Sequence, residues 1–279
     1  MSRPAIRACL FDMDGLILNT EDIYTSCINA ILERYGKPSL PWAIKAKLQG
    51  RPAPAANEIL QQWAKLPISQ EEFLRQYSEM QRIMFPKASA LPGIPDLLAN
   101  LERTRYWEET GDKRYNRVHI ALATSSHTEN FELKTGHLRQ LFSVFPHNRR
   151  ILGDDSRLKP GRGKPLPDIF LLALECINNS LAPGETPIRP EECLVFEDSV
   201  PGVEAGRRAG MRVVWCPHPM LKEEYKGREQ AVLAGLTGEA DGGPIPTSRI
   251  DDGWAEHFKS LVDFPYDRYG IVLPPTDVY

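Results

Sequence analysis

Two aspartates near the N-terminus, Asp12 and Asp14, follow a short apolar run and are followed by Gly15. The run, residues 6–11, is too short for a helix and lacks polar alternation, which favours a strand buried on both faces of a parallel sheet. Ligands of open α/β sheets bind at the carboxyl ends of such strands, and Gly15 allows a tight turn there. Unpaired buried carboxylates are costly, so a divalent cation is the obvious partner. The ordinary alternative is an acidic turn, because Asp-Gly is common in turns.

Three more polar groups follow strand-like segments further along the chain. A hydroxyl pair, Thr124-Ser125, follows residues 119–123, and an acidic pair, Glu197-Asp198, follows residues 193–196. Between them, Lys164 precedes a helix start that has proline in its first turn. One such group would mean little, but four of them in this order are hard to attribute to coincidence.

In this order the four groups resemble the motifs of the haloacid dehalogenase superfamily of aspartate-nucleophile phosphotransferases. The resemblance covers most of residues 6–235 and is closest to the pseudouridine-5′-phosphatase-like branch. Further segments that carry it are Leu91-Pro92-Gly93, Lys134-Thr135, Leu152–Asp155, Phe196–Ala205 and Ala209-Gly210-Met211.

The resemblance implies a role for each acidic residue. Asp12 would be the nucleophile that forms an aspartyl-phosphate, and Asp14 would protonate the leaving alcohol and then activate water. Mg²⁺ would be held by Asp12, the backbone carbonyl of Asp14 and Asp198, with Glu197 binding directly or through water. An acidic N-cap of the next helix is the alternative for the pair Glu197-Asp198, and both roles can coexist.

The phosphate group would contact hydroxyl, amide and ammonium groups. Thr124 and the backbone N–H of Ser125 would bind its oxygens, although an N-cap hydroxyl is a common alternative for Thr124. Lys164 would neutralise the phosphate and the nucleophile. Lys159 is a rival, but only Lys164 precedes the Pro-Asp-Ile-Phe helix start that fits the family pattern.

Two positions bear on activity and substrate. Asn19 stands where the family often has an acidic residue, and an amide can keep the hydrogen bonds of that residue. Gly50-Arg51 resembles the family's specificity loop, and Arg51 would either grip a second polar group of the substrate or be an ordinary exposed arginine. A Schiff-base lysine for phosphonate cleavage, at Lys45 or Lys47, is unsupported but not ruled out.

The elements that must position these groups have an α/β pattern. Helical spacing recurs over 19–35, 41–48, 53–64 and 70–84, which predicts a helical bundle, residues 18–88, inserted after the first strand as a cap. The core, residues 1–17 and 89–279, alternates strands at 119–124, 149–153, 193–197 and 212–216 with helices at 95–103, 128–140, 167–177 and 201–209. This order predicts a Rossmann-like parallel sheet, and the resemblance implies the strand order 5-4-1-2-3.

Three segments look inserted, and the tail has aromatic residues. Residues 103–118, 155–163 and 178–191 exceed usual connections. The first carries basic and aromatic residues, but acidic ones interrupt it, which favours a solvated loop over an RNA-binding segment. In the tail, an amphipathic segment over 254–262 and the residues Phe264, Tyr266 and Tyr269 predict docking on the core.

Composition sets broader limits. The chain has 279 residues, 42% hydrophobic content and a net charge of −3, typical of a soluble globular protein and with no general attraction to nucleic acid or anionic membranes. Five scattered cysteines favour a reducing compartment over a disulfide framework. No signal-peptide core or membrane-spanning run is present. We therefore expect a cytoplasmic protein, with the nucleus left open, that is a monomer or weak dimer.

These observations together predict a Mg²⁺-dependent phosphatase of a small phosphate monoester, a nucleotide or sugar phosphate such as pseudouridine 5′-phosphate. A phosphomutase shares every motif, and a sugar or polyol phosphatase such as a glycerol-phosphate phosphatase is a second alternative. A non-catalytic interaction protein is disfavoured, because a retired site would have little reason to keep four carboxylates.

Overall fold

The computed structural model describes residues 3–51, 53–105, 117–238 and 248–275. Its centre is a six-stranded sheet in the order β3-β2-β1-β4-β5-β6, with all neighbouring strands parallel. The strands are β1 (Ala8–Phe11), β2 (His119–Ala123), β3 (Arg150–Ile151), β4 (Cys193–Glu197), β5 (Arg212–Trp215) and β6 (Ala255–His257). The first five have the order that the family resemblance implies, and the expectation of a Rossmann-like fold is confirmed.

The sixth strand, β6, is a correction to the predicted strand order. It adds to the exposed edge of β5, with Val213 beside Ala255 and Trp215 beside His257. Its three residues, Ala-Glu-His, show no apolar run, so nothing in the pattern distinguishes them from a loop. They form a strand because β5 offers unpaired backbone groups at that edge.

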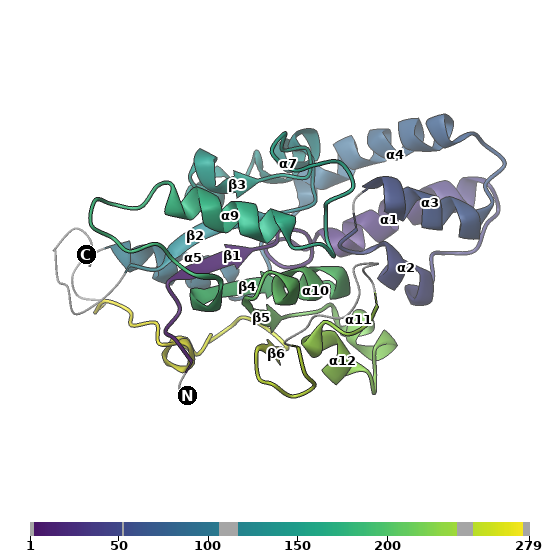
Figure 1. The fold of residues 1–279 in the computed structure, drawn as a ribbon. Helices are drawn as coiled ribbons and strands as arrows, with labels where there is room; N and C mark the ends of the chain where they lie inside the picture. The colour runs from purple at the N-terminus through teal and green to yellow at the C-terminus, as the bar shows by residue number, and fades with distance from the viewer. Residues whose placement is uncertain (1–2, 52, 106–116, 239–247, 276–279) are drawn as a thin grey trace.

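Alternation along the strands divides the core between two faces of the sheet. Cys9, Phe11 and Phe196 belong to the cluster on one face, which also takes in α5 (Ile94–Arg103) and the tail. Leu10 and Val195 belong to the cluster on the other face. Helices α9 (Asp168–Asn178) and α10 (Val200–Arg208) cover this second face, as Figure 1 shows.

The tail docks on the first face, as its aromatic residues predict. Phe264 and Tyr269 are buried, and their rings stack with centroids 5.1 Å apart. Phe264 also lies against Phe196 of β4, with ring centroids 5.3 Å apart. The tail thus completes the core rather than extending from it.

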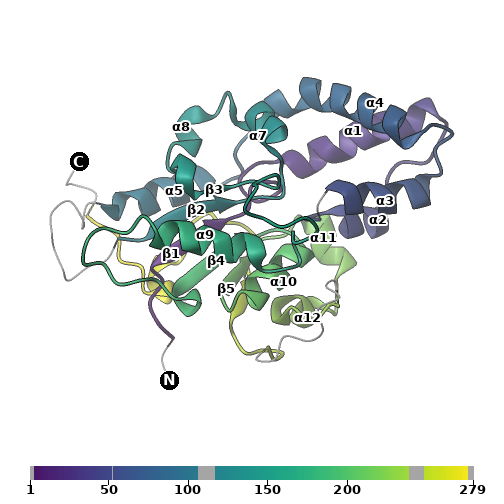
Figure 2. The ribbon, with the colours of Figure 1, turned by 45° about the horizontal axis from the view of Figure 1, so that its top comes forward.

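Four helices, α1 (Thr20–Arg34), α2 (Trp42–Leu48), α3 (Ala53–Ala64) and α4 (Gln70–Met84), lie between β1 and α5 in the chain. We call them the cap helices. They have an apolar cluster of their own, which includes Ile31, Leu60 and Phe73. Figures 1 and 2 show them beyond the end of the sheet to which the strands point. We propose residues 18–88 as a domain distinct from 1–17 and 89–279.

The remaining helices follow the predicted pattern with one break. The predicted helix at 128–140 is two helices, α7 (Thr128–Thr135) and α8 (Arg139–Phe142), with Gly136 as the C-cap of the first. Short helices α11 (Pro219–Glu224) and α12 (Glu229–Ala234) follow β5. Most of the basic and aromatic stretch within 103–118 lies outside the described residues. Among the described residues, none of the helices combines the length and apolar character needed to cross a membrane.

Candidate active site

Three strands end together and bring the motifs to one edge of the sheet. Phe11 of β1 lies beside Leu122 of β2 and Phe196 of β4. The register therefore puts Asp12 level with Glu197, and the backbone N–H of Asp12 donates to the carbonyl of Phe196 at 3.0 Å. Parallel strands dictate this convergence, because all their carboxyl ends lie at the same edge.

Lys164 reaches this edge from the loop before α9. Its ammonium group donates to Asp12 Oδ1 and to the carbonyl of Ala123 at 3.1 Å, and lies 2.6 Å from Glu197 Oε1. Although burial opposes its charge, the carboxylates of Asp12 and Glu197 raise the pKa of Lys164. The rival residue, Lys159, is exposed. The structure thus brings Lys164, not Lys159, to the aspartate of the first motif.

Asp12, Glu197 and Asp198 form a buried acidic cluster whose ligand oxygens lie within 4.8 Å of one another. Burial raises the pKa of Asp12 to about 8, with Lys164 opposing the shift and Glu197 and Asp14 adding to it. Burial, followed by the charge of Glu197, raises the pKa of Asp198 well above its usual range. One lysine is too little positive charge for three carboxylates, and hard oxygen donors of this kind fit Mg²⁺.

Glu197 has several protein partners within this cluster. Its Oε2 accepts from the backbone N–H of Asp198, the N–H of Ser199 and the hydroxyl of Ser199, each at 3.0 Å. Ser199 is the N-cap of α10, and its hydroxyl accepts from the N–H of Gly202 at 3.1 Å. The capping role considered for the acidic pair therefore belongs to Ser199, and Glu197 shapes the loop that carries Asp198.

Gly15 leaves the space that Asp198 occupies. Its φ is +80°, and a Cβ there would lie 2.1 Å from Asp198 Oδ2. Any other residue would displace the carboxylate as well as strain the backbone. Gly15 thus contributes to the acidic cluster by leaving room for the carboxylate of Asp198.

The carboxylate of Asp14 lies in a separate network of donors. Its Oδ1 accepts from Thr20 Oγ1 and Lys134 Nζ, and its Oδ2 accepts from Ser126 Oγ, all at 2.6 Å. Burial alone would raise the pKa of Asp14, but Lys134 and the two hydroxyls lower it below its usual value. The carboxylate is outside the acidic cluster, so only the backbone carbonyl of Asp14, as the sequence analysis assigned, remains a predicted metal ligand.

Lys134 is the main residue of the site to which the sequence motifs give no role. It is fully buried in α7, and its ammonium group also donates to Tyr24 Oη at 2.6 Å and to Ser126 Oγ at 2.7 Å. The rings of Tyr24 and Phe85 lie with their centroids 4.6 Å from it. The signal was present in the Lys134-Thr135 pair of the resemblance, but without a role.

The hydroxyl motif faces both the core and the cap helices. Thr124 is buried, and its Oγ1 accepts from the N–H of Ser126 at 3.2 Å. Helix α7 has His127 as its N-cap, so the N-cap alternative for Thr124 is wrong. Ser125 Oγ donates to the carbonyl of Gly50 at 3.3 Å.

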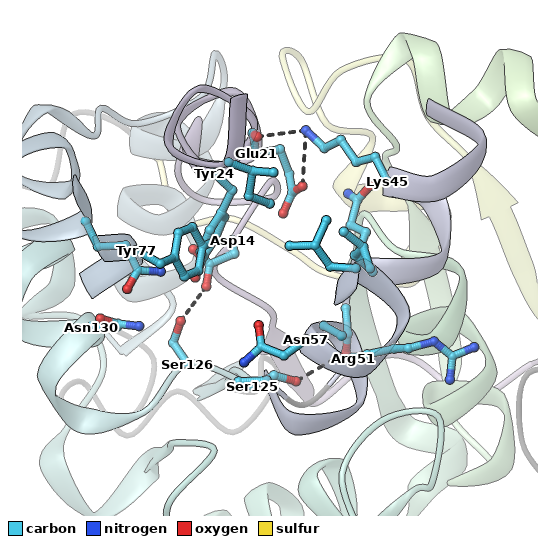
Figure 3. Close-up of a pocket in the computed structure, with 18 of the residues that line it drawn as sticks. Asp14, Glu21, Tyr24, Lys45, Arg51, Asn57, Tyr77, Ser125, Ser126 and Asn130 are labelled. Carbon is cyan, nitrogen blue, oxygen red and sulfur yellow. Dashed lines mark hydrogen bonds and ion pairs between the residues drawn. The ribbon is translucent and has the colours of Figure 1, made fainter. Parts of the chain in front are cut away.

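The loop after α2 lies directly on the core. Gly50 has φ +75°, and a Cβ there would lie 2.2 Å from Ser199 Oγ. The neighbouring Gln49 donates from Nε2 to Asp198 Oδ2. Its Oε1 is buried and has no hydrogen-bond partner among the described residues. Arg51 donates from Nε to the carbonyl of Lys47 at 2.9 Å, and Figure 3 shows its guanidinium group turned away from Tyr24 and Tyr77.

A cavity of about 290 Å³ lies between the cap helices and the strand ends, with Asp12, Asp14 and Thr124 in its wall. Tyr24 and Tyr77 line one side of it, and Lys45 and Arg51 lie on the other (Figure 3). The cap helices and the loop between α1 and α2 also contribute apolar side chains and amides to the wall. These are Ile28, Leu40, Leu48, Leu60, Leu74, Asn57 and Gln81.

Comparison with known proteins agrees with this geometry. The family model for haloacid dehalogenase-like hydrolases matches residues 6–210. The chain belongs to the haloacid dehalogenase-like hydrolase family. It is 41% identical to the probable pseudouridine-5′-phosphatase of Saccharomyces cerevisiae, over 84% of this chain and 92% of the yeast protein. It is 34% identical to (DL)-glycerol-3-phosphatase 2 of Arabidopsis thaliana, over 84% of this chain and 89% of that protein.

The fold of this haloacid dehalogenase-like hydrolase is also similar to solved structures. β-Phosphoglucomutase from Clostridium difficile superposes with a TM-score of 0.60 at 19% identity, over 95% of this chain and 97% of the other. The expectation of a phosphatase enzyme is confirmed by the family and the named relatives.

Asn19 and Lys45 of this hydrolase both make hydrogen bonds to neighbouring segments. Asn19 keeps a hydrogen bond at the family's usual acidic position, since its Oδ1 accepts from the N–H of Ser89 at 2.8 Å. Lys45 donates to the carbonyl of Glu21 at 2.7 Å and to Thr25 Oγ1 at 2.6 Å. These bonds hold Lys45 on α1 and leave the proposal of a Schiff-base lysine without support.

Proposed function

We propose that this protein is a Mg²⁺-dependent phosphomonoesterase that acts through an aspartyl-phosphate at Asp12 on a small metabolite like pseudouridine 5′-phosphate. The observation that carries the proposal is the position of Asp12. Its carboxylate is bound by Lys164 in the wall of the cavity beneath the cap helices. The hydrogen-bond network of Asp14 and the hydroxyl groups of Thr124 and Ser125 line the same cavity. Carboxylate nucleophiles activated in this way form covalent intermediates.

In the first step, a carboxylate oxygen of Asp12 attacks phosphorus, and the bond from phosphorus to the leaving oxygen breaks. The leaving oxygen takes a proton from Asp14, which enters this step as the carboxylic acid and leaves it as the carboxylate that Lys134 binds. Thr124, Ser125 and Lys164 bind the phosphoryl oxygens during transfer. When bound, Mg²⁺ would be held by Asp12, Asp198 and the Asp14 carbonyl, and would supply Lewis acidity toward the phosphoryl group.

In the second step, water attacks the phosphorus and transfers its proton to Asp14. The bond between phosphorus and Asp12 breaks, which releases phosphate and restores the carboxylate. Asp14 suits the role of base, because Lys134, Thr20 and Ser126 stabilise its ionised form. The cap helices exclude bulk water from the cavity.

The cavity wall favours a leaving group with a flat face and polar edges. Tyr24 and Tyr77 offer ring surface, while Asn57, Gln81 and Asn130 offer amide donors and acceptors. A nucleoside uses both, since aromatic side chains stack on bases and amides bond their edges. Glycerol would leave most of this wall without contacts, so we rank a nucleoside monophosphate above glycerol phosphate.

The phosphomutase alternative needs a place for a second phosphate. Among the described wall residues outside the motifs, Lys45 is bound to Glu21 and Thr25, and Arg51 donates to the carbonyl of Lys47. Counter-charge for a bisphosphate is therefore already engaged, which favours transfer to water.

We also propose a cytoplasmic monomer or weak dimer, with the nucleus left open.

A panel of phosphate monoesters tests the proposal. Phosphate release should be measured from pseudouridine 5′-phosphate, UMP, glycerol 3-phosphate and glucose 1-phosphate, each with Mg²⁺ and with EDTA. We expect release that needs Mg²⁺, is fastest with a nucleoside monophosphate and is lost in Asp12→Asn. Conversion of β-glucose 1-phosphate to another hexose phosphate without phosphate release would establish the mutase instead. Phosphate release that persists in Asp12→Asn would reject Asp12 as the nucleophile.

A further inference from the structure

A second cavity lies at the end of the core remote from the cap helices. Its volume is about 470 Å³, and its wall contains Arg3, Arg212, Arg268 and Tyr269. Arg212 begins β5, whereas the active site follows the opposite ends of the strands. The N-terminal segment and the yellow C-terminal segment meet here (Figure 1), where the N–H of Ile6 donates to the carbonyl of Tyr269 at 2.9 Å.

Arg212 is the unusual residue of this cavity. Its side chain is 4% exposed, and its guanidinium lies 4.6 Å from the ring centroid of Tyr269. Within the described parts of the chain it has no hydrogen-bond acceptor and no ion pair, and the carboxylate of Glu256 acts on it only at longer range. The other buried arginines do have such partners. Arg149 donates to Ser180 at 2.9 Å, and Arg207 pairs with Asp252. The guanidinium group of Arg212 is therefore left to the cavity, and a charge with so little contact with water is costly unless an anion joins it there.

The surroundings of Arg212 are positive. Arg268 pairs with Glu256 at 2.6 Å, and Arg3 donates to the backbone carbonyl of Asp252 at 3.0 Å. Glu256 is also the acceptor of a hydrogen bond from Tyr269 Oη at 3.3 Å. Among the residues that the structure describes, three arginines line the cavity and Glu256 offsets the charge of one of them, so the wall is positive.

The backbone makes room for this arrangement. Gly253 has φ +67°, and a Cβ there would lie 2.1 Å from Nη2 of Arg3. Gly270 also has φ +67°, and a Cβ there would lie 2.8 Å from the Cβ of Ala5. Side chains at either glycine would push the N-terminal segment and Arg3 away from the cavity.

We propose that this cavity is a binding site for a phosphate group, with Arg212 as its central ligand. Guanidinium groups bind phosphate oxygens through paired N–H donors. A phosphate dianion balances the excess charge and supplies the acceptors that Arg212 lacks. The cavity is larger than one phosphate group, so its ligand is either inorganic phosphate or the phosphate of a small metabolite. The site is separate from the active site, at the other end of the sheet.

Thermal unfolding of the full chain in EDTA tests the proposal. Wild type and Arg212→Met are compared with inorganic phosphate and with KCl at equal ionic strength. Methionine keeps the contact with Tyr269 but removes the charge. In KCl we expect Arg212→Met to unfold at the same or a higher temperature than wild type. We expect its phosphate-dependent rise in Tm to be less than half that of wild type, because only phosphate binding at the active site remains.

Arg228→Met is the matched control. Arg228 also lies 4.6 Å from a tyrosine ring, that of Tyr225, but it is exposed and donates to the carbonyl of Glu224. Its phosphate response should equal that of wild type. If Arg212→Met does not fold, Arg268→Gln at the exposed rim should reduce the response instead.

An undiminished phosphate response in Arg212→Met, or in Arg268→Gln where that variant is needed, would overturn the proposal. A lower Tm of Arg212→Met in KCl with an unchanged phosphate response would show a purely structural stack on Tyr269. UMP at the same concentration distinguishes the sources of the phosphate group. A larger rise with UMP that is lost in Arg212→Met identifies a metabolite, and a rise with inorganic phosphate alone identifies the free ion.

Discussion

At the scale of single residues, two carboxylates two positions apart have opposite environments. Asp12 has its pKa raised to about 8, chiefly by burial, whereas Lys134 and two hydroxyls lower the pKa of Asp14. The sequence predicted both residues because their motif is contiguous. It could not predict Lys134, which lies 120 positions from Asp14 and meets it only when α7 packs near the loop that follows β1.

Replacement of Lys134 by methionine should lower kcat by on the order of 10²-fold, the size of effect typical of acid–base groups. The KM should change much less, because Lys134 is not itself in the cavity wall and acts through Asp14, Tyr24 and Ser126. Steady-state kinetics measure both constants. Arg139→Met, in the exposed part of α8, serves as control. A variant that changes only KM would contradict a role for Lys134 in positioning Asp14.

The raised pKa of Asp12 predicts that Mg²⁺ binds more tightly as pH rises. Below about pH 8 the metal-free carboxyl keeps its proton, which the metal must displace. Affinity should therefore rise by up to about tenfold per pH unit for one proton, and level off above pH 8. Calorimetry in buffers of different ionisation enthalpy measures affinity and proton release together. Affinity that does not vary with pH would show Asp12 to be ionised before metal binding.

The raised pKa of Asp12 also makes the stability of the metal-free protein depend on pH. The folded-state pKa of Asp12 lies above the unfolded value of 3.8, so the native state binds the extra proton between the two values. Its contribution to the stability of the metal-free protein is fully present below the unfolded pKa. It is lost as pH rises through about 8. Mg²⁺ should oppose that loss.

At the scale of elements, the helices and strands follow from local pattern, and the exceptions have local causes. The four cap helices have the predicted bounds within one or two residues because their apolar spacing is regular. β6 was missed because three residues carry no period and depend on the edge of β5. The position of the loop 49–51 against Asp198 and Ser199 depends on tertiary packing, which no local pattern encodes.

Gly50→Ala tests the contact between this loop and the core. The added Cβ would meet Ser199 Oγ at 2.2 Å, so the loop must move away from the active site. We expect kcat/KM to fall on the order of tenfold to a hundredfold, since small misplacements of active-site groups are costly.

Gly36→Ala is the matched control for that variant. Gly36 has a similar φ of +64°, but a Cβ there meets nothing within 4 Å. Both variants carry a backbone cost of about 1–2 kcal/mol, measurable as a similar fall in Tm. Equal kcat/KM for the two would show that the loop contact does not matter to the reaction.

At the scale of the whole molecule, the cap helices and the carboxyl ends of the strands enclose the cavity that contains Asp12 and Asp14. The sequence predicted this architecture, because strand–helix alternation and parallel crossovers leave few arrangements. It could not predict what fills the remote end of the core. There the tail and the N-terminal segment surround Arg212, and their proximity depends on how residues 248–275 pack on the first face.

Mg²⁺ should stabilise the whole fold through the acidic cluster. At 100 times its Kd, a ligand specific for the native state adds about 2.7 kcal/mol to the free energy of unfolding. We expect this gain in wild type and its loss in Asp198→Asn, measured by denaturant unfolding with Mg²⁺ and with EDTA. In EDTA, Asp198→Asn should be no less stable than wild type, because burial and Glu197 already disfavour the charge of Asp198. An undiminished Mg²⁺ effect in the variant would place the metal elsewhere.

Covalent transfer of the phosphoryl group to Asp12 is the central step of the proposed mechanism. Borohydride reduces an acyl phosphate of aspartate to homoserine, so rapid quenching during turnover of the best substrate, followed by reduction and peptide mass spectrometry, locates the intermediate. We expect homoserine at position 12, only when substrate and Mg²⁺ are both present. Product formation at the normal rate with no homoserine at position 12 would mean that water attacks the substrate directly, and it would contradict the mechanism.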